Sequence, residues 1–251
     1  MRVVGVSTKN RNKNYLQKSL KLYPEMLQDQ YCREVIKQVK KSMVKHARSG
    51  RITINGTYTF ISPDLYAFCE FLFLHKSNPK GLLNDGEVYC NVFRNYKELD
   101  CLRSPHLYIE HAIRKNIIDK EKAKWFTTNA LYTSCHDLIS KILMFDVDGD
   151  KSLVCADNTI IQAAKRNIKN NNIVPLYYDM KKAKPTTIDY KTIYNGLQAA
   201  YKGGNIGMIS NNITKILNST EGDISEKLQV VKLLCLENNF TIDFAKTLYK
   251  P

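Results

Sequence analysis

Apolar and polar positions along the chain divide it into two kinds of region. Between about residues 52 and 178 the apolar runs are short and end at Gly, Pro, Asn or Asp, which is typical of short strands and helices joined by turns. From residue 186 onward apolar residues recur every three or four positions, which predicts helices over 189–202, 205–218 and 222–238. This order predicts an α+β fold in which a barrel-like unit carries a C-terminal helical region.

The same pattern predicts the individual elements. A hairpin is expected over 52–60, because alternating apolar residues flank the turn signal Asn55-Gly56. Other helices are predicted over 24–47, 63–75, 129–141 and 158–167, with a turn and a short helix over 104–115. Strands are predicted over 87–93, 124–128, 142–150, 152–155 and 173–178.

Three carboxylates alternate directly behind the apolar run 142–145. These are Asp146, Asp148 and Asp150. In an extended backbone alternate side chains share a face, so the three carboxylates can converge, and Gly149 allows a sharp bend beside them. Like charges so close together repel unless a cation neutralises them, and oxygen ligands suit Mg²⁺. We therefore expect these aspartates to hold a hard divalent cation.

Other interpretations of the aspartate run stay open. A calcium loop of the EF-hand type would need Gly at its sixth position and Glu at its twelfth, where this chain has Lys151 and Asp157. A strand ending in D-x-D-G also resembles the haloacid-dehalogenase-like phosphatases, with Asp146 as nucleophile and Asp148 as acid. In those enzymes the next residue is normally Thr, whereas here it is Asp150. A third alternative is a non-catalytic nucleic-acid-binding protein whose aspartates are structural.

Charge and cysteine usage narrow the possible partners. The chain has 38 Lys and Arg against 24 Asp and Glu, a formal net charge of +14, which favours a polyanionic partner such as nucleic acid. Its seven cysteines form no C-x-x-C pair, so we expect neither a zinc site nor a disulfide framework, and a cytoplasmic location. No signal peptide is apparent. The longest apolar run, 65–74, is too short to span a bilayer, so no membrane partner is expected.

A second motif precedes the aspartates by about forty residues. It reads Arg103-Ser104-Pro105-His106-Leu107-Tyr108, or R-x-P-x-L followed by a ring. With D-x-D-G-D it resembles the second double-psi β-barrel of the cellular-type RNA polymerases. The likeness is greatest to the single-chain enzymes of phages and of eukaryotic RNA silencing. In many of these the sixth position of the first motif is His, where this chain has Tyr108. Further segments keep the family's order: 86–88, 151–154, 158–165, 205–211 and 241–247.

The resemblance implies a domain organisation and an activity. A double-psi β-barrel-like catalytic domain is expected over 81–180, after a basic helical and hairpin region over 1–80 and before a helical region over 181–251. The implied reaction is nucleotidyl transfer for RNA synthesis, with nucleoside triphosphates as substrates, a DNA or RNA template and an RNA product. Because the family's active site lies between two barrels and residues 1–85 show no first barrel, the chain is expected to be a fragment or a subunit. A second chain would then supply the other barrel.

The resemblance also assigns the site residues. It implies a two-metal mechanism with Mg²⁺, for which Mn²⁺ can substitute, and substrate contacts from the first motif and from the residue after the aspartates. The metal-binding and catalytic residues would be Asp146, Asp148 and Asp150. The substrate-binding residues would be Arg103, Pro105 and Lys151. For a phage protein the location would be the host cytoplasm.

Overall fold

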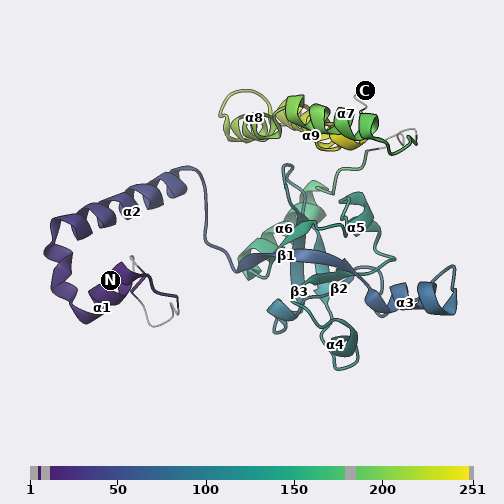
Figure 1. Ribbon diagram of the computed structural model, residues 1–251, viewed down its shortest axis with the longest axis horizontal. Coiled ribbons are helices and arrows are strands. Elements are labelled where there is room, and N and C mark those ends of the chain that lie inside the picture. Colours follow the sequence, from purple (N-terminus) through teal and green to yellow (C-terminus); the bar gives the residue numbers. More distant parts are fainter. Residues whose placement is uncertain (1–4, 7–11, 179–184, 249–251) are drawn as a thin grey trace. The chain divides into compact units, whose positions relative to one another are not determined.

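The computed structural model describes residues 5–6, 12–178 and 185–248, and the chain forms two units, residues 1–54 and 55–251. The first unit contains the helices α1 (Tyr15–Leu22) and α2 (Gln30–Arg48), joined by a 3₁₀ turn at Pro24–Gln28 (Figure 1). The Asp29 side chain accepts a hydrogen bond from the Cys32 N–H and so caps α2. The helix predicted over 24–47 is thus present as two parts, the 3₁₀ turn at its start and α2 after it.

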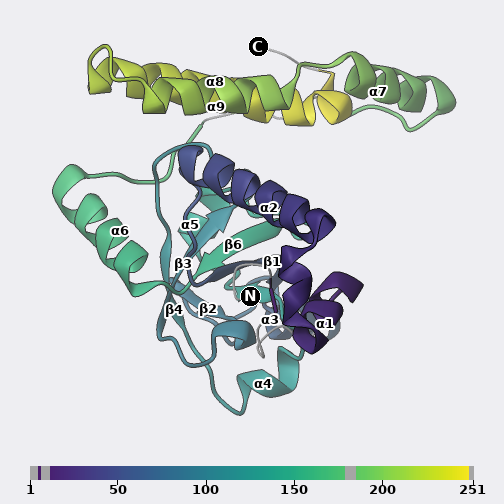
Figure 2. The same cartoon turned by 90° about the vertical axis from the view of Figure 1, so that its left-hand side faces the viewer.

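The second unit is built on a closed barrel of six strands (Figures 1 and 2). The strands are β1 (Gly56–Pro63), β2 (Glu87–Tyr89), β3 (Glu98–Arg103), β4 (Ile113–Asn116), β5 (Leu131–Thr133) and β6 (Lys151–Cys155). Their order around the barrel is β1-β5-β2-β4-β3-β6, in which β1–β5 and β2–β4 are parallel and the other pairs are antiparallel. The α+β fold predicted from the sequence, with a barrel and helices on both sides of it in the chain, is confirmed.

The strands are short, and their inward side chains form the apolar core of the barrel. Val88, Leu99, Leu131 and Val154 come from four strands and have no exposed surface. Burying each of these side chains contributes about 1.5–3 kcal/mol. A second apolar cluster surrounds the aromatic pair Phe126–Tyr132, whose rings stack at a centroid distance of 4.5 Å.

Two acidic side chains, one at the N-cap of α3 (Leu65–Leu74) and one within it, fix the loop that leads into β2. Asp64 caps the helix through the Tyr66 and Ala67 amides, and its second oxygen accepts the N–H groups of Leu82 and Leu83 at 2.6 and 2.9 Å. Glu70 accepts two further loop amides and the Lys76 ammonium, and these bonds lower the pKa of its carboxyl. Both acidic side chains are buried, so the loop is tied to the barrel at several points.

Several predicted elements differ from the structure. The hairpin expected at 52–60 is wrong, because β1 pairs with β5 and β6, which lie far along the chain, rather than with 52–54. Because β1 is part of the barrel, the barrel begins before residue 81, the residue at which the sequence predicts the barrel-like domain to start. The predicted strand at 124–128 is wrong, because 124–125 belong to α4 (Lys122–Trp125) and 126–128 form no strand. The predicted helix at 129–141 is divided between β5 and α5 (Leu138–Ile142). The short helix predicted within 104–115 is absent, and the sequence pattern predicts neither β3 nor β4, which begins at Ile113.

Helices complete the second unit. The helix α6 (Asn158–Asn171) is followed by 172–178, where the predicted strand is absent and the side chains of Leu176 and Tyr178 pack against the C-terminal helices instead. The three predicted helices are confirmed as α7 (Tyr190–Lys202), α8 (Ile206–Asn218) and α9 (Ile224–Thr247), of which α8 and α9 pack side by side (Figure 2). Among the described residues, no helix is both long enough and apolar enough to cross a membrane.

Candidate functional site

The pairing of β3 with β6 brings the two sequence motifs together. Arg103 is the last residue of β3 and lies opposite Ser152 of β6, two residues after Asp150. The Ser104 N–H donates to the Lys151 carbonyl at 3.1 Å, and the Ile61 N–H donates to the Asp150 carbonyl at 3.0 Å. The backbone of the D-x-D-G-D motif therefore ends between two barrel strands, beside the R-x-P motif.

The segment that carries the aspartates is a loop, so the predicted strand over 142–150 is wrong. The apolar run begins at Ile142, the last residue of α5, and continues as a turn in which the amides of Leu143, Met144 and Phe145 donate back to helix carbonyls. Phe145 packs against the barrel core, which explains why the run is apolar. We call residues 143–150 the aspartate loop; it turns at Gly149, whose φ of 133° suits glycine.

The three aspartates have different surroundings. The Asp150 Oδ2 atom lies 3.5 Å from the Arg103 Nε atom, and both atoms are buried without a hydrogen-bond partner. Asp146 and Asp148 are exposed, and Asp146 accepts a hydrogen bond from the next backbone amide, that of Val147. The guanidinium thus compensates one carboxylate, while the other two face solvent.

This arrangement fits a metal in its donor chemistry but does not form a ligand set. The donors are carboxylate oxygens, which suit Mg²⁺, and the unsatisfied Asp150 Oδ2 is an atom that a cation would stabilise. However, the described residues contain no group of three or more His, Cys, Asp or Glu side chains placed to hold one ion. The convergence of Asp146, Asp148 and Asp150 expected from strand alternation is therefore absent, because the backbone there is not extended.

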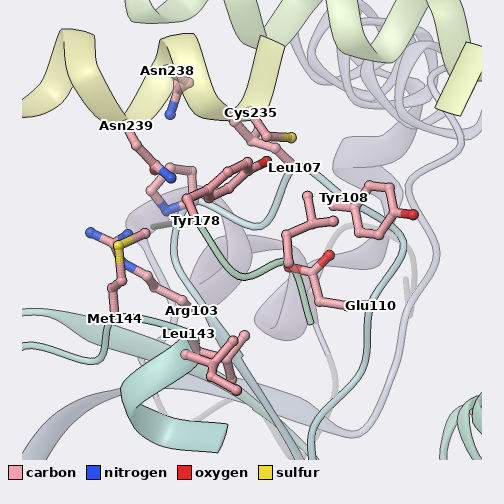
Figure 3. A pocket seen from close by; sticks show the side chains of 13 residues that line it. Arg103, Leu107, Tyr108, Glu110, Leu143, Met144, Tyr178, Cys235, Asn238 and Asn239 are labelled. Atoms are coloured by element: carbon pink, nitrogen blue, oxygen red, sulfur yellow. The ribbon is translucent and has the colours of Figure 1, made fainter. Parts of the chain in front are cut away.

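A pocket lies beside Arg103, between the R-x-P motif, the end of α5 and α9 (Figure 3). Its volume of ≈ 60 Å³ is far below the roughly 300–1,000 Å³ typical of small-molecule sites, so it does not enclose a nucleotide. Its lining residues are Arg103, Pro105, Leu107, Tyr108, Glu110, Ile142, Leu143, Met144, Leu176, Tyr178, Cys235, Asn238 and Asn239. The Tyr178 hydroxyl donates to the Lys232 carbonyl at 2.8 Å, which ties this wall to α9.

Several polar side chains near the pocket are not predicted from the sequence. Asn238 is 1% exposed, and its Oδ1 atom is buried without a hydrogen-bond partner. Burial raises the pKa of the Glu110 carboxyl, whose Oε2 atom is also unpartnered. The Nδ1 atom of His111 donates a hydrogen bond to the buried Asp100 carboxylate at 2.6 Å, and this bond raises the pKa of His111. No spacing or motif marks these residues, which come from β3, from the loop after Arg103 and from α9.

The structure places the remaining predicted substrate residues differently. Pro105 lines the pocket beside Arg103, after a cis Ser104–Pro105 peptide bond. Lys151 is exposed on β6, and its ammonium lies 4.6 Å from the centroid of the Phe60 ring. Arg103, Pro105 and the aspartate loop are thus neighbours, whereas Lys151 belongs to the outer face of the barrel.

Comparison with known proteins identifies a relative. The chain is 51% identical, over 252 aligned residues that cover all of it, to the DNA-directed RNA polymerase YonO of Bacillus phage SPbeta. The aligned part is 29% of that polymerase, so the chain spans less than a third of its relative's length. No model of a known protein family matches the chain. The match and the closed six-strand barrel confirm the resemblance to the single-chain, phage-encoded RNA polymerases.

Proposed function

We propose that this chain carries the catalytic aspartates of a phage-type, DNA-directed RNA polymerase and catalyses, or contributes to, nucleotidyl transfer. Two observations together support this most. Over the whole of this chain the identity to part of a phage RNA polymerase is 51%, and the pairing of β3 and β6 joins the two motifs. In this reaction the 3′-hydroxyl of the RNA attacks the α-phosphate of a nucleoside triphosphate, a P–O bond forms, and pyrophosphate leaves. The hydroxyl proton passes to solvent.

The aspartate loop is proposed to hold the metal. Asp146, Asp148 and Asp150 would provide oxygen ligands, with the loop adjusting at Gly149, where a Cβ atom would meet nothing within 4 Å. Bound Mg²⁺ would supply neutralisation of the charge that develops on the phosphate oxygens, and Mn²⁺ has similar ligand preferences. A cation at Asp150 would also compete with Arg103 for that carboxylate, which would release the guanidinium towards a phosphate.

Arg103 is proposed to contact the incoming nucleotide. Its planar guanidinium can donate two parallel hydrogen bonds to phosphate oxygens, and it already lies at the end of a barrel strand beside the aspartate loop. Pro105 restricts the turn that follows. The positive net charge would attract the DNA template and the RNA product through their backbones, without reading sequence.

The remainder of the active site is proposed to come from other polypeptide. The aligned relative is more than three times longer than this chain, and the described residues form one closed barrel. A second barrel, on another chain or another segment, would supply the cationic groups for the triphosphate.

The test is template-dependent incorporation of labelled nucleotides on single-stranded DNA and RNA, with Mg²⁺ and with Asp148→Ala as the control. Asp148 is exposed and makes no compensating contact with Arg103, so its removal should leave the fold intact while incorporation falls to background. Incorporation that survives in Asp148→Ala would contradict the assignment. Template-free release of phosphate from a monoester would instead support the phosphohydrolase alternative, although the absence of a strand before the aspartates disfavours it.

A further inference from the structure

The outer face of the barrel carries two aromatic rings that the core does not use. Tyr58 and Phe60 on β1 are 59% and 56% exposed, whereas the alternate residues Thr59 and Ile61 are 6% and 5% exposed. Residues i and i+2 of a strand share a face, so both rings project from the same side of β1. Two neighbouring exposed rings place apolar surface side by side on one strand, and contiguous exposed apolar surface is a feature of binding sites.

A cation lies directly over one of these rings. Lys151 is opposite Phe60 in the antiparallel register of β1 and β6, and its ammonium is 4.6 Å from the ring centroid. This cation–π contact keeps the exposed charge beside the aromatic pair. The face therefore combines a surface for stacking with a positive charge for a phosphate.

The same face adjoins the aspartate loop through backbone hydrogen bonds. Lys151 directly follows Asp150, and the Asp150 carbonyl accepts the N–H of Ile61, the residue after Phe60. On the other side of β6, the Lys151 carbonyl accepts the Ser104 N–H beside Arg103. The aromatic pair is thus one strand away from the residues proposed for catalysis.

The exposed aromatic residues of α3 lack this combination, whereas Tyr15 in the first unit also has a lysine, Lys18, over its ring. The helix α3 exposes Phe68, Phe71 and Phe73, the last by 70%, but contains no basic residue, so its surface suits an apolar polypeptide partner. The face on β1 and β6 suits a ligand that has both planar rings and negative charge. A nucleic acid with unpaired bases meets both conditions, and the net charge of +14 favours its approach.

We propose that Tyr58, Phe60 and Lys151 form a stacking surface for the unpaired bases of a single-stranded nucleic acid next to the aspartate loop. Successive bases would stack on the two rings, while Lys151 would contact a phosphate. The bases of a duplex are already stacked and paired, so duplex DNA would not use the rings. This inference rests on the proposed function in one respect: the proposed function identifies the bound nucleic acid as the template or the RNA product.

The test is fluorescence anisotropy of the full chain with a labelled mixed-sequence oligonucleotide, single-stranded and as a duplex, in EDTA at several salt concentrations. Phe60→Ala and Phe60→Leu should weaken single-strand binding by about fivefold to a hundredfold, the range expected for one stacked base, and leave duplex binding unchanged. Lys151→Ala should reduce the slope of the logarithm of the binding constant against the logarithm of salt concentration by about one, because one phosphate contact is lost. The Phe60 variants should leave this slope unchanged. Phe73→Ala on α3 is the matched control and should bind as the native chain does.

Two results would overturn the stacking surface. The first is single-strand binding that is unchanged in Phe60→Ala and Phe60→Leu; the second is an equal loss in Phe60→Ala and Phe73→Ala. Phe60→Leu keeps apolar contact on the strand, so matching thermal unfolding with the native chain shows that a loss does not come from misfolding. The two proposals can fail separately, because this binding is measured in EDTA, without metal. Binding that depends on Phe60, in a chain whose incorporation survives in Asp148→Ala, would support the surface and contradict the proposed function. Incorporation that requires Asp148, with binding independent of Phe60, would do the reverse.

Discussion

The buried ion pair between Arg114 and Asp137 holds α5, and with it the start of the aspartate loop, on the barrel. The Arg114 Nε atom donates to Asp137 Oδ2 at 2.7 Å, and the side chains are 9% and 1% exposed. Asp137 also caps α5 through the Ile139 amide and accepts the Ser140 hydroxyl. We therefore expect Asp137→Asn to destabilise the protein although the substitution is nearly isosteric.

The magnitude follows from the burial of the pair. Removing one partner of a buried ion pair costs about 3–5 kcal/mol, because the other charge is left uncompensated. The amide oxygen that Asp137→Asn introduces can still cap the helix, since Asn and Asp are equivalent caps, so about 3 kcal/mol is expected for this substitution. Asp157→Asn is the matched control: Asp157 caps α6 in the same way and makes no ion pair among the described residues, so less than about 0.5 kcal/mol is expected.

Urea unfolding followed by circular dichroism measures these free energies. A third variant, Arg114→Met with Asp137→Asn, removes both charges and should recover most of the loss, because no uncompensated charge remains. The same variants should show whether the aspartate loop depends on this anchor. Equal small losses in Asp137→Asn and Asp157→Asn, or a double variant that loses at least as much as Asp137→Asn alone, would refute the reasoning.

Three further predictions concern the loop anchor, the histidine beside the site and the proposed nucleotide contact. Asp64→Ala should lower the free energy of unfolding in urea by about 3 kcal/mol, because it removes a helix cap and leaves two loop amides without an acceptor. Asp157→Ala removes only a cap and should lower it by about 1 kcal/mol. Because Asp100 raises the pKa of His111, the stability from this pair is fully present below about pH 6.5 and is lost as the pH rises through the raised pKa. The urea midpoint should therefore fall as the pH rises above about 6.5, and His111→Gln should flatten that fall; an unchanged slope would contradict the assignment. In steady-state incorporation assays, Arg103→Lys keeps the charge but loses the planar fork, so it should raise KM for the nucleotide about tenfold without weakening template binding. Equal loss of both would count against the proposed contact.

The helical part of the fold could be predicted from local signals. Asn205 and Asp223 each cap the helix that follows, and apolar residues recur with helical spacing through α8 and α9. The barrel could not be read in the same way, because its strands are short and pair with distant segments. All three residues of β5 are buried, so the strand shows no alternation, and its partner β1 lies about 70 residues earlier.

The candidate site could be predicted in its residues but not in its geometry. The two motifs identify Arg103 and the three aspartates through their order along the chain, and β3–β6 pairing brings Arg103 beside Asp150. The apolar run before Asp146 predicts a strand, but short apolar runs do not distinguish a strand from a helix, and here the run is the end of α5 and the turn that follows it. Asn238 reaches the site from α9, more than a hundred residues after Arg103, and nothing in the local sequence indicates this.

The central claim is that the aspartate loop and the R-x-P motif form one metal-dependent site, and localised cleavage by Fe²⁺ tests it most directly. Fe²⁺ can replace Mg²⁺ at carboxylate sites. When hydrogen peroxide is added, bound Fe²⁺ is oxidised to Fe³⁺ and the peroxide is reduced to hydroxide and a hydroxyl radical, which cuts the backbone nearby, so the result does not depend on catalytic activity. We predict cuts within 146–150 and 103–108 that excess Mg²⁺ suppresses and that Asp148→Ala abolishes. Cuts elsewhere in the chain, or cuts at these segments that persist in Asp148→Ala, would contradict the account.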